Sequence, residues 1–203
     1  MNIAIVDYNM GNLASVINAF KIIGANTTVE SEPNKLKEYD KVILPGVGAF
    51  GDAMSHLQSN GMDEAIKEYA KSGKPLLGIC LGMQLLFESS QEFGSTKGLG
   101  LIPGEVVAFD TSKFDHKLKV PHMGWNEIFV KDSPIFDGMD REFYLYFVHS
   151  YHAKCNERYT IGKTYYGYEF TSAVQNNNIY GIQPHPEKSH KNGLKIIENF
   201  VKL

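Results

Sequence analysis

The spacing of apolar residues in the first half of the sequence alternates between the period of a strand and that of a helix. Residues 2–7 (NIAIVD) predict a buried strand, and apolar positions at helical spacing from 11 to 23 predict a helix that stops at Gly24. The same signals predict strands at 26–30, 41–45 and 74–80, and helical segments at 52–71, broken at Gly61, and at 81–89. This alternation favours a parallel sheet flanked by helices.

The second half has shorter apolar runs, rich in aromatic and β-branched residues, which are typical of antiparallel strands. These runs, between residues 104 and 183, are EVVAF, WNEIFV, FYLYFV, KTYYGY, SAVQ and IYGIQ. Residues 191–202 (KNGLKIIENFVK) predict a final helix. We therefore expect one three-layer α/β domain spanning 1–203, with a mostly parallel central sheet and a β-rich C-terminal extension.

Composition narrows the class of protein. A length of 203 residues fits one domain with a full core, and a net charge of -3 argues against nucleic-acid binding. No apolar run approaches the roughly 20 residues that span a bilayer, and MNIAIVDY lacks the basic flank and cleavage site of a signal peptide. Two cysteines 75 positions apart favour a reducing compartment. We expect a cytoplasmic enzyme or binding domain without a membrane partner.

A candidate nucleophile lies between the predicted strand at 74–80 and the helix after it. Gly78-Ile79-Cys80-Leu81-Gly82 has the form G-x-C-x-G, the cysteine version of a nucleophile elbow, in which the glycines avoid clashes in a strained turn. A thiolate at a helix N-terminus is stabilised by free N–H groups, and the N–H of Leu81 would be one oxyanion donor. The alternative is that Cys80 is a small core residue.

A candidate base and its orienting group follow in Gln183-Pro184-His185-Pro186-Glu187. The two prolines predict an extended segment, in which residues two apart project to the same side. His185 and Glu187 can then share one face, either in direct contact or through a turn. A cysteine nucleophile needs a base, and that base needs a group that holds its tautomer. The alternative is a surface loop with an incidental histidine.

Two other kinds of site are weaker interpretations. Residues 46–51 have the form G-x-G-x-x-G, which is typical of a dinucleotide site. Such a site also needs an acidic residue at the end of a second strand about 20 residues later. The sequence there, IKEYAK, predicts a helix instead. The glycines fit better as a loop that presents N–H groups to an oxyanion. His149 with His152, or His185 with His190, have spacings that suggest a metal site, but no cysteine or carboxylate cluster completes one. We expect neither metal nor cofactor.

Five segments together resemble a known family along nearly the whole sequence. They are PGVGAFGDAM at 45–54, KPLLGICLGMQLLFE at 74–88, KVPHMGWN at 119–126, YFVHSYH at 146–152 and HPEKS at 185–189. The sequence resembles the glutaminase subunits of imidazole glycerol phosphate synthase, which are class I (triad-type) glutamine amidotransferases. PGVG and PHMGWN are the segments that distinguish these subunits from other class I amidotransferases.

The resemblance implies a role for particular residues. It implies a triad of Cys80, His185 and Glu187, and an oxyanion hole completed by the loop with Val47 and Gly48. Substrate glutamine would be held by Gln84, Ser150, Tyr151 and Gly48. The partner would be a cyclase with a (β/α)8 barrel, bound in a heterodimer and fed with ammonia for imidazole glycerol phosphate and AICAR in histidine biosynthesis. Its interface would include Pro121, His122, Met123, Gly124, Trp125 and Asn126, although Trp125 also fits an ordinary core position.

Several alternatives remain open. Pro184 stands where the family usually has an aromatic residue, which affects the fine positioning of His185. VHSYH and HPEKSHKNGLK also resemble glutaminases that supply ammonia for amidino sugars in surface-polysaccharide or flagellin-glycan pathways. Outside this family, a cysteine peptidase or a DJ-1-like hydrolase uses a similar elbow but lacks the His-Pro-Glu pair. A non-catalytic interaction subunit would need a broken triad.

Overall fold

The first half of the protein is a run of parallel strands joined by helices, as the apolar spacing predicted. The computed structural model describes all residues, 1–203. The elements are β1 (Ile3–Val6), α1 (Leu13–Ile22), β2 (Thr27–Glu30), β3 (Lys41–Leu44), α2 (Phe50–Ser59), α3 (Met62–Lys71), β4 (Leu76–Ile79) and α4 (Leu81–Leu85). The helical stretch breaks at Gly61, whose φ of 81° favours glycine.

The second half consists mainly of strands. They are β5 (Phe87–Ser90), β6 (Thr96–Lys97), β7 (Ile102–Ala108), β8 (His122–Val130), β9 (Glu142–His149), β10 (Tyr151–Cys155), β11 (Thr160–Tyr165), β12 (Glu169–Asn176) and β13 (Ile179–Ile182), followed by helix α5 (His190–Lys202). Short 3₁₀ turns are η1 (Pro33–Glu38), η2 (Thr111–Lys113), η3 (Pro134–Phe136), η4 (Glu157–Tyr159) and η5 (Pro186–Lys188).

All thirteen strands belong to one branched sheet. Its centre, β2-β1-β3-β4-β13, is parallel throughout, and β12 pairs antiparallel with β13. Beyond β12 the sheet divides into one branch through β10 and β7 and another through β11, β8 and β9. The mostly parallel centre with a β-rich extension is therefore confirmed. The carboxyl ends of β3, β4 and β13 meet at one edge, and open α/β sheets bind their ligands outside the carboxyl ends of their strands.

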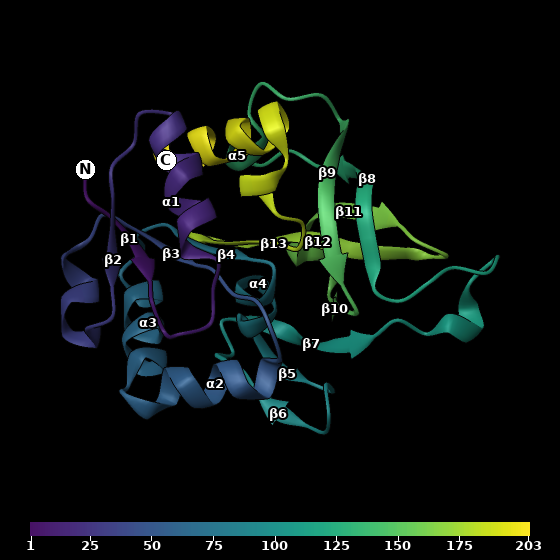
Figure 1. The fold of residues 1–203 in the computed structure, drawn as a ribbon, viewed down its shortest axis with the longest axis horizontal. Helices are drawn as coiled ribbons and strands as arrows, with labels where there is room; N and C mark the ends of the chain where they lie inside the picture. The colour runs from purple at the N-terminus through teal and green to yellow at the C-terminus, as the bar shows by residue number, and fades with distance from the viewer.

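Helices cover both faces of the central sheet, which gives three layers (Figure 1). Alternate strand residues pack into two separate cores because successive side chains point to opposite faces. Ile5, Ile43 and Leu77 pack with α1 and α5. Val6, Leu44 and Leu76 pack with α2, α3 and α4. No helix is both long enough and apolar enough to span a bilayer.

The helix predicted over 81–89 is too long. Helix α4 ends at Leu85, and β5 begins two residues later. In a continuing helix, the carbonyls of Leu85 and Leu86 would accept hydrogen bonds from the amides four residues later. Instead, the Leu85 carbonyl accepts a hydrogen bond from the N–H of Leu99, and the Leu86 carbonyl accepts from those of Leu101 and Ile102. Strand β5 then pairs with β7. Tertiary pairing here overrides a local pattern that reads as helix.

Candidate active site

Cys80 lies at a sharp turn between β4 and α4. Its φ of 54° and ψ of −111° are rare for a residue with a side chain, so this backbone is strained. Two glycines permit the turn. A Cβ atom at Gly78 would lie 2.6 Å from the carbonyl oxygen of Gly82, and one at Gly82 would overlap the carbonyl oxygen of Leu44. The Gly-x-Cys-x-Gly segment therefore has the geometry of a nucleophile elbow.

His185 and Glu187 are in direct contact. Nδ1 of His185 lies 2.7 Å from Oε1 of Glu187, and both side chains are almost fully buried. The prediction of an extended segment was wrong. Residues Pro186–Lys188 form η5, and Pro186 occupies its first position, where a missing N–H is tolerated. This 3₁₀ turn, and not strand alternation, brings the carboxylate onto the imidazole.

Hydrogen bonds to β9 hold the backbone that carries His185. The N–H of His185 donates to the carbonyl of Tyr146 at 2.8 Å. The hydroxyl of Ser189 donates to the carbonyl of His185 at 2.6 Å and accepts from the N–H of Tyr146 at 2.9 Å. Because two of these bonds join the turn to the sheet and the third closes the turn, the position of the imidazole is set by the fold and not by a free loop.

The surroundings of His185 favour its charged form. Burial alone lowers the pKa of His185, but the neighbouring Cys80 sulfur and the Glu187 carboxylate outweigh burial and raise that pKa to about 10. Nε2 has no hydrogen-bond partner within the protein. The imidazolium is thus favoured at neutral pH, and Nε2 is free to exchange a proton with a thiol or a substrate.

The glycine loop at 45–48 packs against the start of α4. A Cβ atom at Gly46 would overlap the hydroxyl of Tyr8 and lie 3.0 Å from the Cβ of Leu81, so only glycine fits. The Tyr8 hydroxyl donates to the carbonyl of Pro45 at 2.8 Å. Gly48 has a φ of +102°, which glycine adopts readily. Leu81 begins α4, and its N–H therefore has no acceptor within the helix.

A cavity of about 260 Å³ lies between these elements. Its lining contains most of the residues that the sequence analysis selected: Val47, Gly48, Cys80, Leu81, Gln84, Ser150, Tyr151 and His185. Glu187 lies behind His185, outside this lining. The lining also contains Glu92, Val148 and His149, which the sequence analysis did not select as site residues.

Glu92 is a charged residue of this cavity that sequence reasoning missed. Its Oε2 accepts a hydrogen bond of 2.7 Å from the N–H of Phe50, at the start of α2. An anion is stabilised there by the free N–H groups of a helix N-terminus. No motif marks this residue. It reaches the cavity only because β5 replaces the end of the predicted helix, and that replacement depends on tertiary pairing.

Two buried amides connect the cavity to the sulfur. Gln84 Nε2 donates to the carbonyl of Tyr151 at 3.0 Å and to Oε1 of Gln183 at 3.0 Å, which uses both of its protons. The carbonyl oxygen of Gln84 is therefore the atom left for a ligand. Gln183 Nε2 donates to Sγ of Cys80 at 3.7 Å. Sequence reasoning considered Gln183 only as the neighbour of Pro184 and missed this contact.

The segment 121–126 does not present all of its side chains on one surface. Met123 is 61% exposed and Trp125 is 48% exposed, whereas His122 is only 2% exposed. Successive side chains of β8 point to opposite faces, so His122 faces inward and makes no surface contact. Trp125 stacks on the ring of His190, with 5.2 Å between ring centroids. The interpretation of Trp125 as a core residue was therefore wrong.

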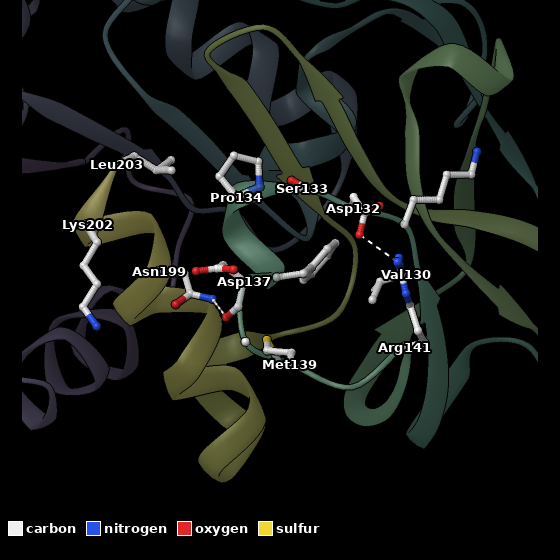
Figure 2. A pocket seen from close by; sticks show the side chains of 13 residues that line it. Val130, Asp132, Ser133, Pro134, Asp137, Met139, Arg141, Asn199, Lys202 and Leu203 are labelled. Atoms are coloured by element: carbon white, nitrogen blue, oxygen red, sulfur yellow. Dashed lines mark hydrogen bonds and ion pairs between the residues drawn. The ribbon is translucent and has the colours of Figure 1, made fainter.

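A larger cavity, of about 720 Å³, lies between the β8–β9 connection, which contains η3, and the end of α5 (Figure 2), and it shares no lining residue with the cavity at the elbow. Its charged groups already have partners or face solvent. Arg141 pairs with Asp132 at 2.8 Å in an exposed ion pair, and the Asn199 amide donates to the carbonyls of Ile135 and Asp137. Size alone does not identify a site, so the smaller cavity with Cys80 and His185 is the candidate.

The histidine pairs considered for a metal site do not form one. No three His, Cys, Asp or Glu side chains are arranged to hold a metal ion. His185 pairs with Glu187, whereas His190 stacks on Trp125.

Comparison with known proteins shows which family the sequence matches. Residues 4–203 match the family described as "Glutamine amidotransferase class-I". The sequence is 73% identical over 201 residues to "Imidazole glycerol phosphate synthase subunit HisH" of Sulfurimonas denitrificans, covering 98% of this chain and 97% of that protein. It is 56% identical over 203 residues to the protein of the same name from Wolinella succinogenes, covering 99% of each.

Solved structures share the fold at low sequence identity. "Structure of PurLQS from Thermotoga maritima" aligns with a TM-score of 0.79 and 21% identity over 99% of this chain and 97% of that chain. A second structure, titled "Crystal structure of glutamine amidotransferase", aligns with a TM-score of 0.76 and 16% identity over 98% of this chain and 97% of that one. At these identities the likeness concerns the fold alone.

Proposed function

The chain belongs to the class I glutamine amidotransferase family, among the HisH subunits of imidazole glycerol phosphate synthase in histidine biosynthesis, and from this premise we propose how its residues act. Cys80 is the nucleophile, His185 is the general base and acid, and Glu187 orients the imidazole. The observation that carries this assignment is a strained cysteine at an elbow, in one cavity with a histidine whose Nδ1 meets a buried carboxylate at 2.7 Å.

The reaction begins with the thiolate of Cys80. Its sulfur forms a bond to the carboxamide carbon of glutamine, and the carbonyl oxygen becomes an oxyanion that accepts from the N–H of Leu81 and from the loop with Val47 and Gly48. His185 gives its proton to the departing nitrogen, ammonia leaves, and a thioester remains. Water, deprotonated by His185, then breaks the thioester into glutamate and the free thiolate.

The cavity offers groups that match both ends of glutamine. The Glu92 carboxylate is the counter-charge for an α-ammonium group, and the Gln84 carbonyl oxygen can accept an N–H. Ser150 and Tyr151 also line the cavity. Hydrogen bonds to charged groups contribute about 1.5–3 kcal/mol. Glu92→Gln should therefore raise the KM for glutamine roughly tenfold or more, while its amide oxygen still caps α2; an unchanged KM would remove Glu92 from the substrate site.

An exposed apolar surface marks the side on which a partner would bind. Met123, Trp125, Phe129 and Tyr144 are all between 46% and 61% exposed on the paired strands β8 and β9. We call these four residues the docking face. Aromatic residues and methionine are enriched in the cores of interfaces. The proposed occupant is the synthase subunit, a (β/α)8-barrel cyclase that receives the ammonia and forms imidazole glycerol phosphate and AICAR.

The names of both relatives support a histidine pathway over an amidino-sugar pathway. The molecule that accepts the ammonia distinguishes the two pathways. The complex should release imidazole glycerol phosphate only with a cyclase barrel, whereas a sugar pathway would need a sugar-modifying partner.

We expect the isolated subunit to be a poor glutaminase. Glycines at 46 and 48 leave the peptide planes of the loop free to take more than one orientation, and one missing oxyanion donor costs about 10²–10³ in rate. A partner that binds the competent orientation more tightly would activate hydrolysis. Full activity of the lone subunit, unchanged on adding partner, would instead indicate a stand-alone hydrolase.

The experiment that tests the triad compares the two cysteines. Cys80→Ser should abolish ammonia release while leaving the folded structure and partner binding intact. A thiol-alkylating glutamine analogue should label Cys80 and spare Cys155, because burial raises the pKa of the Cys155 thiol. Cys155→Ser is the matched control and should retain activity. Hydrolysis surviving in Cys80→Ser, or equal labelling of both thiols, would refute the assignment, and peptide turnover without glutaminase activity would favour a peptidase.

A further inference from the structure

Two buried histidines lie close to the active site without belonging to the triad. His122 on β8 and His149 at the end of β9 are 2% and 6% exposed. Nδ1 of His122 lies 2.9 Å from Nε2 of His149. The aromatic rings around them include Phe109, Phe147 and Tyr166, with the His122 ring stacked on Tyr166 at 4.0 Å between centroids. His149 also lines the cavity that contains Cys80.

The protons of this pair can be assigned from their partners. Burial lowers the pKa of His122 to about 4 and that of His149 to about 3, so both rings are neutral and carry one proton each. Nδ1 of His149 faces the carbonyl of Tyr151 at 2.8 Å and must donate to it. Nε2 of His149 then accepts from Nδ1 of His122. Nε2 of His122 in turn accepts from Asn126 Nδ2 at 3.1 Å.

The hydrogen bonds continue from Tyr151 to the nucleophile. The Tyr151 carbonyl accepts a second hydrogen bond, from Gln84, whose other amide proton goes to Gln183. Gln183 donates to Sγ of Cys80. We call the whole series the relay; it comprises Asn126, His122, His149, the Tyr151 carbonyl, Gln84, Gln183 and the Cys80 sulfur. In the relay each histidine ring donates to one acceptor, whereas the amide nitrogens of Asn126 and Gln84 each donate to two.

We propose that the relay couples the docking face to the nucleophile, with Asn126, His122, His149 and Gln183 as positioning residues. This proposal rests on the proposed function. One end of the relay is adjacent in sequence to Trp125 of the docking face, and Asn126 is also anchored to the carbonyl of Tyr165 at 2.9 Å. The other end holds the sulfur. Between them, His149 fixes the Ser150–Tyr151 turn that lines the substrate cavity.

The physical reason is that a buried polar series has few alternative arrangements. Breaking one link leaves a donor or acceptor unsatisfied in a low-dielectric interior, which costs more than the bond itself contributes. The neighbouring links then realign or open. A shift of β8 on partner binding therefore reaches Gln84 and Gln183 through defined contacts. The partner activates through this route only if it binds the aligned relay more tightly than a broken one.

The first test replaces His122 with phenylalanine, which keeps an aromatic ring and removes both hydrogen bonds. The measured quantity is the activation ratio, the rate of ammonia release with saturating partner and acceptor divided by the rate of the subunit alone. His122→Phe should lower this ratio about fivefold to tenfold, the effect of one net hydrogen bond. Its partner affinity should change little because His122 is buried. Met123→Ala, on the opposite side of the same strand, should weaken affinity and retain the ratio at saturation.

The second test reverses the direction of the relay. Asn126→Asp replaces a donor with an acceptor at a half-buried position, so the proton of His122 should move from Nδ1 to Nε2. Imidazole ¹⁵N chemical shifts report this tautomer directly. The wild type should show Nδ1–H on both His122 and His149, and Asn126→Asp should lower the activation ratio at least as much as His122→Phe does.

A double-mutant cycle connects the two ends. Two independent sites normally give additive free-energy effects, so their effects on a ratio multiply. Because the relay couples the two sites, His122→Phe and Gln183→Met should together change the activation ratio by less than the product of their separate effects. Multiplicative effects would overturn the proposal. Equal losses with and without partner in His122→Phe, or Nε2–H on His149 in the wild type, would also overturn it. The proposed function fails separately, if Cys80→Ser retains hydrolysis.

Discussion

Two regions of this protein bury a histidine against a second side chain, and the two histidines differ in charge state. His185 lies against the Glu187 carboxylate near Cys80, and its pKa is raised to about 10. His149 lies against neutral His122 among aromatic rings, and its pKa is lowered to about 3. Both histidines are almost fully buried.

The difference shows that burial does not by itself determine the charge of a histidine. Desolvation penalises the imidazolium in both regions, and only a fixed negative partner reverses that penalty. The charged His185 can give a proton to a departing nitrogen. The neutral pair cannot, but its single protons define a direction for hydrogen bonding. One region is suited to proton transfer, and the other is suited to positioning.

The largest expected effect separates the two roles directly. His185→Ala should lower ammonia release by about 10²–10⁴ because it removes the general base. His122→Phe should lower it far less, since that residue transfers no proton. His116, which is exposed and paired with Asp115, supplies the control, and His116→Ala should retain activity. Steady-state rates of the complex check the series. Similar losses for His185→Ala and His122→Phe would end the distinction between the two regions.

A smaller effect is expected when His185 is given the neutral surroundings of the other region. Glu187→Gln keeps an oxygen for Nδ1 but removes the charge that helps to raise the pKa of His185. The loss of turnover should be roughly tenfold to a hundredfold smaller than in His185→Ala, because Glu187 orients the base and does not transfer the proton. An equal loss would mean that Glu187 does more than orient. A pH–rate profile should show the pKa of His185 falling.

The two regions should also destabilise the protein at opposite ends of the pH scale. Unfolded histidine titrates near pH 6.5. Because the folded pKa values of His122 and His149 lie below 6.5, stability from these residues is present above pH 6.5 and lost as pH falls towards about 4 and 3. The folded pKa of His185 lies above 6.5. The stability that His185 contributes is therefore present below pH 6.5 and is lost as the pH rises through about 10.

Urea unfolding between about pH 4 and about pH 10 measures both trends. One pKa unit corresponds to about 1.4 kcal/mol, so each trend is large enough to detect. His122→Phe should weaken the pH dependence of the free energy of unfolding below pH 6.5 and leave it unchanged above pH 6.5. Glu187→Gln should weaken it above pH 6.5 and leave it unchanged below. A variant that flattened both sides would contradict the assignment of each trend to its own region.

Local patterns were sufficient for the parallel half of the fold and for the central chemistry of the candidate site. Apolar spacing located β1, α1, β3 and β4 within a few residues, because their buried faces repeat at regular intervals. The elbow could be predicted because the spacing of Gly78 and Gly82 around Cys80 is a local motif, although the contact that requires glycine at 82 comes from the distant carbonyl of Leu44. His185 and Glu187 were predicted as a pair because their contact is also local, although the segment that joins them was predicted as extended and forms a 3₁₀ turn.

What the sequence alone determined is therefore what short-range geometry controls: the period of each element, the strained turn at Cys80 and the pairing of His185 with Glu187. Only the tertiary structure decided which residues far apart in the chain meet. The pairing of β5 with β7 ended α4 early and brought Glu92 to the cavity. The packing of β8 and β9 against the central sheet joined Asn126, His149, Gln84 and Gln183 into one relay. Such contacts depend on the closure of long loops, and no local pattern of residues records them.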